Sequence, residues 1–301
     1  MGNQIFSVVV NWNLKEETVA CLDSLLSTDP PNSQVILVDN ASADDSVSSV
    51  RHSFGSEVTI VQNEQNRGYA AGLNQGINRA LESGATWVFL LNNDTVVDRE
   101  IFSQFRKAVK SQPEFTIFAP TIYYQDRPQI VWYYGGRFIP GTLITRPLVQ
   151  GKTLPGNLPP IQEIDIVTGC ALLVHKDVFR EVGLFDQSLF MYGEEVDYLW
   201  RARMNGNRIA VVRDAKLWHK VSASSSGDKS ATRYYRVRNQ NLFYRNYTKQ
   251  TQKAIMLGFS ILKLVRYGVE DLAHRETDLL RPTARGWYDG WFSPVPVLPD
   301  P

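Results

Sequence analysis

Three clusters of polar residues have types and spacing that could do chemistry, and each follows a short apolar run. They are Asn11-Trp12-Asn13, Asp39-Asn40-Ala41-Ser42 and Asn92-Asn93-Asp94. Asp94 is the carboxylate of the third cluster. Mg²⁺ and Mn²⁺ favour carboxylate oxygens and complete their coordination shells with water and substrate phosphates, so one or two protein ligands suffice. Asp94 is therefore expected to be either a ligand of a divalent metal or, as a single acid in a turn, a structural residue.

The first two clusters offer groups that could bind a nucleotide. Asp39 can accept a hydrogen bond from a base N–H or a ribose hydroxyl, and Trp12 can present a stacking face. The alternative for Asp39 is a helix N-cap or an Asx-turn, positions that Asp favours. The turn Asn11–Lys15 has no glycine, so the chain lacks the fingerprint of a Rossmann dehydrogenase, and it has no P-loop.

An acidic stretch supplies candidate general bases. Glu194, Glu195 and Asp197 open a segment whose apolar residues Val196 and Leu199 have helical spacing. The helix dipole alone favours acidic residues in a first turn. The same dipole favours an ionised carboxylate, the form that accepts a proton from a hydroxyl. Both interpretations of the acidic stretch remain open at this stage.

The elements that must position these residues alternate along the first third of the chain. Segments with helical spacing separate four short apolar runs, namely Phe6–Val10, Val35–Val38, Val58–Val61 and Trp87–Leu91. This alternation predicts an α/β fold with a mostly parallel, doubly wound sheet. Such sheets bind ligands beyond the carboxyl ends of their strands, so we expect the three polar clusters to converge in space.

The rest of the chain is less regular. The Gly- and Pro-rich stretch Tyr133–Pro160 predicts an irregular insertion or a hairpin. We expect further strands at Cys170–Val174 and Ile209–Val212, and helices from Lys176, over Glu195–Met204 and beyond Tyr234. The segment Ser224–Lys229 is either a lid that orders over a ligand or a solvated linker.

Composition excludes several classes of protein. Thirty-two basic and 31 acidic residues among 301 give a net charge of +1, so no overall field favours nucleic acid. Cys21 and Cys170 have no metal-type spacing, which favours a reduced, cytoplasmic protein. No signal segment is visible after Met1. The apolar stretch Ala254–Leu262 is too short to span a bilayer, so we expect a soluble or peripheral protein.

Five motifs in register carry a family resemblance. They are Ser7–Asn13, Val38–Ser42, Asn66–Gly76, Leu91–Asp94 and Met191–Asp197. Together they resemble a family 2 glycosyltransferase of the GT-A fold, in particular the bacterial rhamnosyltransferase-like branch, over about residues 5–245. The resemblance implies inverting transfer of a sugar from a nucleotide-sugar to an acceptor hydroxyl, assisted by Mn²⁺ or Mg²⁺.

The resemblance also assigns donor-side roles to individual residues. It implies that Asp39 contacts the base, that Asn11 and Trp12 lie along the nucleotide, and that Arg67, Gly68 and Asn74 shape its pocket. Asn92, Asn93 and Asp94 stand where the family has its DxD motif, with Asn92 in place of the first Asp. This substitution leaves Asp94 as the charged metal ligand from this loop, and His219 matches the position of a metal-binding histidine. The alternative for His219 is a neutral, half-buried side chain.

On the acceptor side, the resemblance implies that Glu195 is the general base. Most relatives carry Asp there, and this departure leaves Asp197 or Glu194 as substitutes. It also leaves a second hypothesis, a nucleotide-sugar-binding protein with impaired catalysis. A sugar-1-phosphate nucleotidylyltransferase would need a phosphate-binding loop that residues 11–14 do not supply.

The resemblance further implies partners and a division of the chain. We expect a TDP- or UDP-linked donor and a glycan or lipid-linked acceptor in cell-surface polysaccharide assembly, with rhamnose as a candidate sugar. The predicted domains are a transferase domain over 1–245, with its nucleotide part about 1–97 and its acceptor part about 98–245, and a helical extension over 246–301. The basic segment Tyr234–Arg245 and the apolar stretch Ile255–Val265 could hold the chain at an anionic membrane surface or near a lipid-diphosphate acceptor. The alternative is an ordinary amphipathic helix that packs on the transferase domain or on a second subunit.

Overall fold

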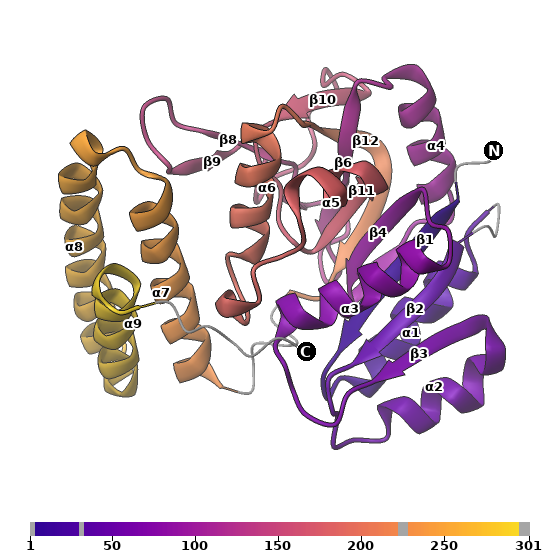
Figure 1. Cartoon of the computed structure of the whole chain (residues 1–301), viewed down its shortest axis with the longest axis horizontal. Helices are drawn as coiled ribbons and strands as arrows, with labels where there is room; N and C mark the ends of the chain where they lie inside the picture. The colour runs from indigo at the N-terminus through magenta and orange to yellow at the C-terminus, as the bar shows by residue number, and fades with distance from the viewer. Residues whose placement is uncertain (1–3, 30–32, 222–227, 295–301) are drawn as a thin grey trace.

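The computed structural model describes residues 4–29, 33–221 and 228–294 (Figure 1). Four strands of its first third are parallel and lie in the order β3-β2-β1-β4. Their bounds are β1 (Ile5–Asn11), β2 (Ser33–Asp39), β3 (Val58–Gln62) and β4 (Trp87–Asn92). The helices between them are α1 (Lys15–Leu26), α2 (Ser46–Phe54) and α3 (Tyr69–Glu82), with a short 3-10 turn at Gly55–Glu57. The predicted alternation of strands and helices is therefore confirmed.

Side chains of β1 alternate between two hydrophobic cores. Phe6, Val8 and Val10 pack toward α3, whereas Ile5 and Val9 pack toward α1. Because the sheet is buried on both faces, its strands consist of nearly continuous apolar residues. The polar residues that follow each strand are thereby left at one edge of the sheet.

The second half of the chain widens the sheet and makes it mixed. The sheet continues from β4 through β11, β6 and β12 to β10, and β11 is antiparallel to both of its neighbours. The added elements are β5 (Thr95–Val97), α4 (Ile101–Ser111), β6 (Phe115–Tyr124), β7 (Val131–Tyr133), β10 (Ile161–Ile164), β11 (Ala171–His175), α5 (Lys176–Val182), the 3-10 turn Gln187–Leu189, α6 (Glu194–Met204) and β12 (Arg208–His219). The strand predicted to end at Val212 extends to His219, because a register shift between Val212 and Lys216 lets the same strand resume pairing with β6.

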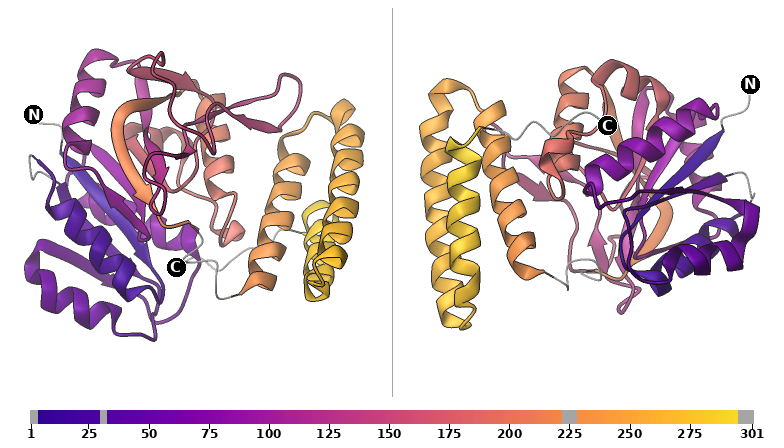
Figure 2. Two further views of the ribbon diagram at one scale, coloured as in Figure 1. Left: turned by 180° about the vertical axis from the view of Figure 1, so that it is seen from behind. Right: turned by 60° about the horizontal axis from the view of Figure 1, so that its bottom comes forward.

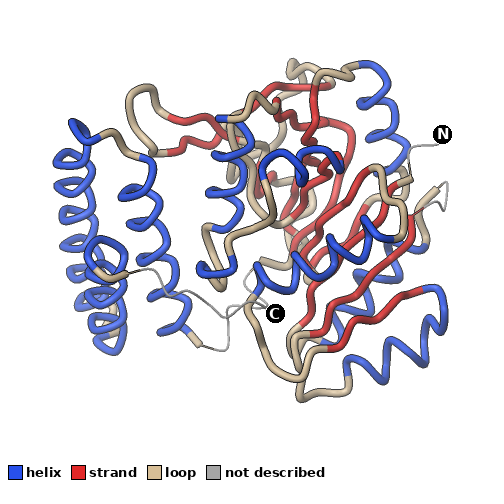
Figure 3. Tube along the Cα trace, in the orientation of Figure 1, coloured by secondary structure: helices blue, strands red, loops and turns tan. Residues whose placement is uncertain are grey.

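The Gly- and Pro-rich insertion contains a hairpin, as predicted. Its strands are β8 (Gly136–Phe138) and β9 (Thr145–Pro147), and Figure 3 shows it reaching from the sheet toward the C-terminal helices. At its tip, Leu143 joins a small core with Phe243, Met256 and Trp291. The insertion therefore connects the sheet to the helical part of the chain.

Three helices beside the sheet end the described chain. They are α7 (Lys229–Tyr247), α8 (Gln250–Ala273) and, after a 3-10 turn at Thr277–Leu279, α9 (Leu280–Phe292) (Figure 2). Among the described residues, no helix has the length and apolarity needed to cross a bilayer. The predicted domain boundary at residue 245 falls in the last turn of α7 and stays a prediction. Residues 224–227 of the predicted lid or linker lie outside the described ranges.

Candidate active site

A cleft of about 1310 Å³ separates the edge of the sheet from α7 and α8. Its sheet side is lined by the carboxyl ends of β1 and β4, and its far side by residues of both helices. Most of the predicted site residues reach this one cleft: Asn11, Trp12, Gly68, Asn92, Asn93, Asp94, Glu195 and His219. The expected convergence of the three polar clusters is confirmed, since Asn40 of the second cluster also lines the cleft and Asn11 is hydrogen-bonded to Asp39 and Ser42.

Amide side chains form a buried network beneath the sheet side of the cleft. Asn11 is fully buried, and its Nδ2 donates to Asp39 Oδ1 at 2.8 Å. Its Oδ1 accepts from Thr18 Oγ1 at 2.8 Å and from Asn93 Nδ2 at 3.0 Å. Asn11 is therefore fixed through both ends of its amide and Asn93 through its Nδ2, so the cleft floor is ordered and polar without carrying charge at these two positions.

Asp39 forms a turn. Its carboxylate is fully buried and accepts from the Ser42 backbone N–H at 3.0 Å and from Ser42 Oγ at 2.6 Å, in addition to Asn11. The side chain is therefore engaged within the protein, as the turn-forming alternative expected, and it does not line the cleft. Its contact with a base stays a prediction.

Two of the predicted pocket residues next to α3 behave differently from one another. Gly68 lies on the cleft wall with φ 87°, and a Cβ there would meet the Phe190 side chain at 2.6 Å and the Phe190 carbonyl oxygen at 2.7 Å. Asn74 instead faces the core, where its amide exchanges two hydrogen bonds with the backbone of Phe185 at 2.9 and 3.0 Å. Asn74 does not line the cleft, so its predicted part in shaping the nucleotide pocket would be indirect, through the loop after α5 that its amide holds. Arg67 is half-buried and lies between two cleft residues, Asn66 and Gly68, without lining the cleft itself.

Asp94 and His219 are brought together by strand pairing. β5 pairs with β12 so that Thr95 lies opposite His219. His219 Nε2 lies 3.0 Å from Asp94 Oδ1, and both side chains are almost fully buried. Burial opposes protonation of His219, but the nearby Cys170 and the hydrogen-bonded Asp94 outweigh it and raise the pKa of the imidazole to about 10.

This pair fits a divalent cation. Asp94 Oδ2 is buried and has no hydrogen-bond partner among the described residues, and both side chains line the cleft. His219 Nε2 is the ring nitrogen that faces Asp94, so it is the one that could share a cation with this carboxylate. A carboxylate oxygen and an imidazole nitrogen are ligands for Mn²⁺, and Mg²⁺ is often held by one carboxylate plus substrate phosphates. The described residues contain no group of three or more His, Cys, Asp or Glu side chains arranged around a metal position. A cation bound here would therefore depend on a ligand's phosphates for much of its coordination shell.

Asn92, in place of an acid, has a neutral partner. Its Oδ1 accepts from the Tyr69 hydroxyl at 2.6 Å. Burial raises the pKa of Tyr69 well above its ordinary value, so the phenol stays protonated and donates. A carboxylate at position 92 is thus not needed to fix this loop.

Two acidic side chains of α6, Glu194 and Glu195, also line the cleft. Glu195 Oε2 accepts from the Gly193 backbone N–H at 3.2 Å, and a Cβ at Gly169 would lie 3.1 Å from Glu195 Cβ. Glu194 is 5% exposed, and its Oε2 has no partner among the described residues. Burial raises the pKa of both carboxyl groups, and the neighbouring Glu195 charge raises that of Glu194 further.

Asp197 is a structural residue, which corrects its prediction as a catalytic candidate. Its Oδ2 accepts from Arg201 Nε at 2.8 Å and its Oδ1 from the Tyr247 hydroxyl at 2.6 Å. It is 7% exposed and does not line the cleft. Because both oxygens are occupied, Asp197 ties α6 to the end of α7 and is not placed to take a proton from a ligand.

The loop of residues 188–193, which leads into the acidic start of α6 and is called the acidic loop below, is held by two residues that the sequence did not single out. Asn239 Nδ2 lies within hydrogen-bond distance of three carbonyl oxygens in residues 189–192, at 2.8, 2.9 and 2.6 Å. Arg238 donates to the carbonyls of Ser188 and Leu189. Phe190 and Tyr192, both in the anchored loop, have φ values of 63° and 64°, which are costly for these residue types. The sequence shows only that Arg238 and Asn239 lie in a basic segment with helical character. It does not show that they are buried or which loop they contact.

The fold and the cleft together define a nucleotide-sugar-dependent transferase architecture. Residues 7–183 match the family described as Glycosyl transferase family 2, and the chain belongs to that family with the GT-A fold. It is 22% identical over 236 residues to the low-salt glycan biosynthesis hexosyltransferase Agl10 of Haloferax volcanii, covering 78% of this chain and 73% of that protein. It is 25% identical over 263 residues, 81% of each chain, to the dTDP-rhamnosyl transferase RfbF of Shigella flexneri, in agreement with the rhamnosyltransferase-like branch.

Solved structures share the fold at low identity. A mannosyltransferase from Pyrobaculum calidifontis, in complex with GDP-Man and Mn²⁺, has a TM-score of 0.58 and 14% identity, and the match covers 95% of this chain and 86% of that one. GalNAc-T7, solved with UDP, GalNAc and Mn²⁺, has a TM-score of 0.60 and 14% identity, and the match covers 80% of this chain and 50% of that one. The predicted fold class is therefore confirmed.

Proposed function

We propose that this chain transfers a sugar from a TDP- or UDP-linked donor to a hydroxyl group of a glycan or lipid-linked acceptor, with inversion at the anomeric carbon. The observation that carries the proposal is the presence of Asp94 and Glu195 on one cleft, reached from β4 and α6. The first suits a diphosphate-bound cation and the second suits a proton acceptor. The similarity to the dTDP-rhamnosyl transferase RfbF supports rhamnose as the sugar, and the Mn²⁺ in the two solved complexes supports a divalent cation.

The residues divide the reaction between binding of the donor and activation of the acceptor. Asn11, Asn93 and the exposed Trp12 would contact the nucleotide, while Asp94 and His219 would hold Mn²⁺ or Mg²⁺. Such a cation supplies positive charge to the departing diphosphate. Glu195 would take the proton of the acceptor hydroxyl as its oxygen attacks the anomeric carbon. Because the base and the leaving group lie on opposite faces of the sugar, a single displacement inverts the configuration.

The first experiment is a thermal-shift series with UDP, TDP and GDP, each with and without Mn²⁺. A ligand that binds the native state raises the melting temperature. We expect one nucleotide to give a Mn²⁺-dependent shift that Asp94→Ala abolishes. The control Asp98→Ala removes a half-buried acid whose printed side-chain contact is with the Glu100 backbone N–H of its own turn and which does not line the cleft. If no nucleotide shifts the melting temperature at millimolar concentration, the donor site is wrong.

A second candidate function is nucleotide-sugar binding without catalysis. It is favoured by the neutral Asn92–Tyr69 pair in the metal loop and by Glu195 at a position where relatives carry Asp. Release of nucleoside diphosphate in the presence of acceptor separates the two functions. Multiple turnovers that depend on Glu195 would eliminate the binding protein, whereas binding with less than one turnover per chain would favour it. A cytoplasmic location at the inner face of the membrane, and a homodimer, remain separate predictions.

A further inference from the structure

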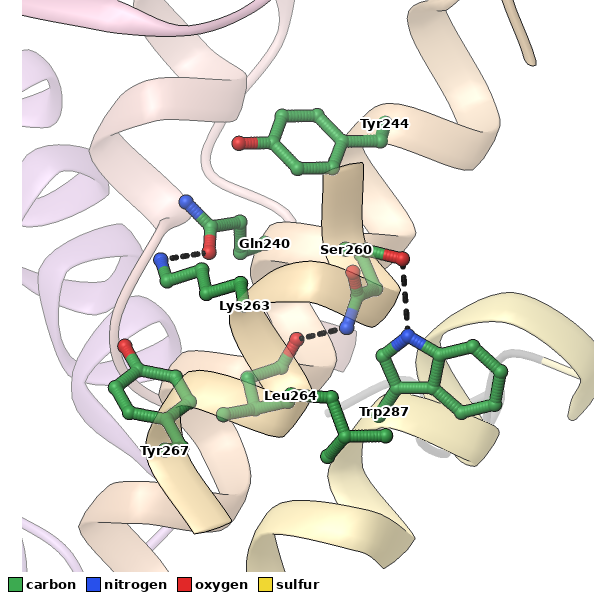
Figure 4. Close-up of a pocket in the computed structure, with 9 residues that line it drawn as sticks. Gln240, Tyr244, Ser260, Lys263, Leu264, Tyr267 and Trp287 are labelled. Carbon is green, nitrogen blue, oxygen red and sulfur yellow. Dashed lines mark hydrogen bonds between the residues drawn. The ribbon is translucent and has the colours of Figure 1, made fainter. Parts of the chain in front are cut away.

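The polarity of α8 is reversed relative to that of an ordinary surface helix. Its buried residues are Met256, Ser260 and Asp271, so two of the three are polar. Asp271 bonds Arg233 of α7 at 2.9 Å. Ser260 Oγ accepts from the Trp287 indole N–H of α9 at 2.9 Å (Figure 4). A surface helix normally turns its apolar face inward, whereas most of the apolar side chains of α8 are left on its outer face.

These exposed apolar residues form a regular stripe, called the seam below. Ile255, Leu262 and Val269 are seven residues apart, and Val265 and Leu272 follow the last two at a spacing of three. Each of these side chains is between 58% and 71% exposed. Their spacing is that of the a and d positions of a helix–helix contact, and it is sustained over about 26 Å of helix. An exposed apolar surface of this kind marks an interaction site. With the intervening glycine, the seam comprises Ile255, Gly258, Leu262, Val265, Val269 and Leu272.

The seam is complementary to its own reverse. When two copies of α8 are placed antiparallel about a two-fold axis, one register sets Ile255 of each chain opposite the partner's Leu272. The same register sets Leu262 of each chain opposite the partner's Val265. Every a position then meets a d position along the whole seam. One face of one helix can therefore supply both halves of an interface.

The charges along α8 favour the same antiparallel direction. Residues 249–263 carry three lysines and no acidic residue, whereas residues 264–278, which include the turn after the helix, carry four acids and two arginines. Lys249 at one end and Asp278 at the other are both exposed. An antiparallel pair places the positive half of each helix beside the negative half of its partner, and a parallel pair would place like charges together. An anionic lipid surface would attract only the first half.

We propose that the seam binds a second copy of this chain, with the two α8 helices packed antiparallel in the register that pairs Ile255 with the partner's Leu272. Figures 1 and 2 show α8 at the edge of the molecule away from the sheet, where a second copy has access to it. Phe259, Leu262 and Arg266 lie on or beside the seam and also line the cleft. The partner's helix therefore runs along the rim of each cleft. This arrangement gives the second subunit a face, a direction and a register, and it does not depend on the proposed function.

The mass in solution tests the interface. Light scattering should give twice the 34.1 kDa of one chain. The double variant Val265→Asp/Val269→Asp brings carboxylates into the seam, where their burial is costly, so sedimentation equilibrium should show the Kd of the dimer raised at least about ten-fold. Neither valine lines the cleft, so the nucleotide-induced thermal shift should be unchanged. Met204→Asp is the matched control, because Met204 is an apolar residue of α6 that is 60% exposed, and this variant should keep the dimer mass.

Disulfide cross-linking tests the direction and the register. Cys21 and Cys170 are both buried, so thiols introduced on α8 can be oxidised selectively. A mixture of the single variants Ile255→Cys and Leu272→Cys should give a cross-linked dimer on mild oxidation. Either variant alone should not, because the two copies of the same residue would lie about 26 Å apart, whereas a disulfide requires Cα atoms within about 7 Å.

The other outcomes overturn the proposal in different ways. A monomeric mass at submillimolar concentration would exclude the dimer. If the monomer then binds vesicles of phosphatidylglycerol and the Val265→Asp/Val269→Asp variant does not, the seam contacts a lipid surface instead. A dimer that the double variant leaves intact would place the interface on another face, and cross-linking of either single variant with itself would show a parallel pair. These measurements use neither nucleotide nor acceptor, so failure of the thermal-shift series would leave them unaffected.

Discussion

The side-chain amide of Asn239 lies 2.6 Å from the carbonyl oxygen of Tyr192, two residues before the acidic pair of α6. Together with its contacts to the Leu189 and Met191 carbonyls, this bond holds a loop in which Phe190 and Tyr192 have left-handed backbone conformations. The position of Glu195 at the cleft therefore depends on a residue of α7 that has no predicted contact with either substrate.

Asn239→Ala should lower kcat by at least about ten-fold while leaving the Kd for the donor nucleotide within about two-fold, because the loop moves and the donor end does not. The buried carbonyls left without a donor should also cost about 1–3 kcal/mol of unfolding free energy. Steady-state kinetics and nucleotide titration measure the first two quantities. Asn205→Ala is the control, since Asn205 also bonds a backbone carbonyl of α6 but at its exposed end. A parallel loss of nucleotide affinity would show that the effect is general unfolding.

Glu195→Gln should reduce kcat by about 10²–10⁴-fold, the range expected for loss of a general base. Glu194→Gln should retain most activity, because burial and the adjacent Glu195 charge raise the pKa of Glu194 and keep it protonated. The two substitutions are isosteric and adjacent, so each serves as the control for the other. The reverse result would assign the base to Glu194.

The burial of Glu195 also sets the pH dependence of the rate. Because the pKa of Glu195 is raised, kcat/KM should rise with pH and level off only above the ordinary glutamate range. The free energy of unfolding should instead fall as the pH rises. A carboxyl group with a raised folded-state pKa contributes stability below its unfolded pKa, and this contribution is lost as pH rises through the folded value. Glu195→Gln should flatten the stability profile over that window, as measured by urea unfolding.

Gly68→Ala tests the contact between α3 and the acidic loop. Gly68 has φ 87° and ψ 165°, a region that essentially only glycine occupies, so alanine should cost about 1–3 kcal/mol in backbone strain, and the approach of its methyl group to Phe190 a further ~1–3 kcal/mol. Gly84→Ala is the control for a positive φ without a close contact, because Gly84 has a φ of 90° and its nearest neighbour would be 3.6 Å away. Denaturant unfolding of the two variants gives the difference. Equal destabilisation would mean that Phe190 moves aside without penalty.

His219→Ala should weaken Mn²⁺ binding at least about ten-fold in the presence of nucleoside diphosphate, since one of two protein ligands is lost. His52→Ala, in the last turn of α2 and exposed, is the control. Calorimetric titration of Mn²⁺ measures both. Unchanged affinity in His219→Ala would leave Asp94 and the phosphates as the ligands and return His219 to a structural role.

Local periodicity was enough to predict β1 to β4, because buried parallel strands are short continuous apolar runs such as Val8–Val10. It was not enough for the sheet's far half. The direction of β11 is set by its pairing with β4 and β6, a long-range relationship that Ala171–His175 does not encode locally. The register shift after Val212 likewise depends on β6.

The site shows the same limit. Family motifs led to Asp94 and His219, which the structure brings into contact. Asn74 and Asp197 belong to those motifs too, but their side chains bond other parts of the protein. Asn74 bonds the backbone of Phe185, and Asp197 bonds Arg201 and Tyr247. Polar residues at an active site and polar residues that support it have similar sequence signatures, and only their three-dimensional neighbours tell them apart.

The bonds from α7 to the acidic loop and from Tyr247 to Asp197 limit how this chain can be recombined. A chimaera that takes its sheet from one relative and its terminal helices from another would separate each of these donors from its acceptor. The partners of Arg238, Asn239 and Tyr247 lie 47 to 50 residues upstream in the chain. A chimaera that exchanges the terminal helices should therefore keep Arg238, Asn239 and Tyr247 together with the sheet of their own chain. The most informative crossover point for testing acceptor preference lies after Tyr247.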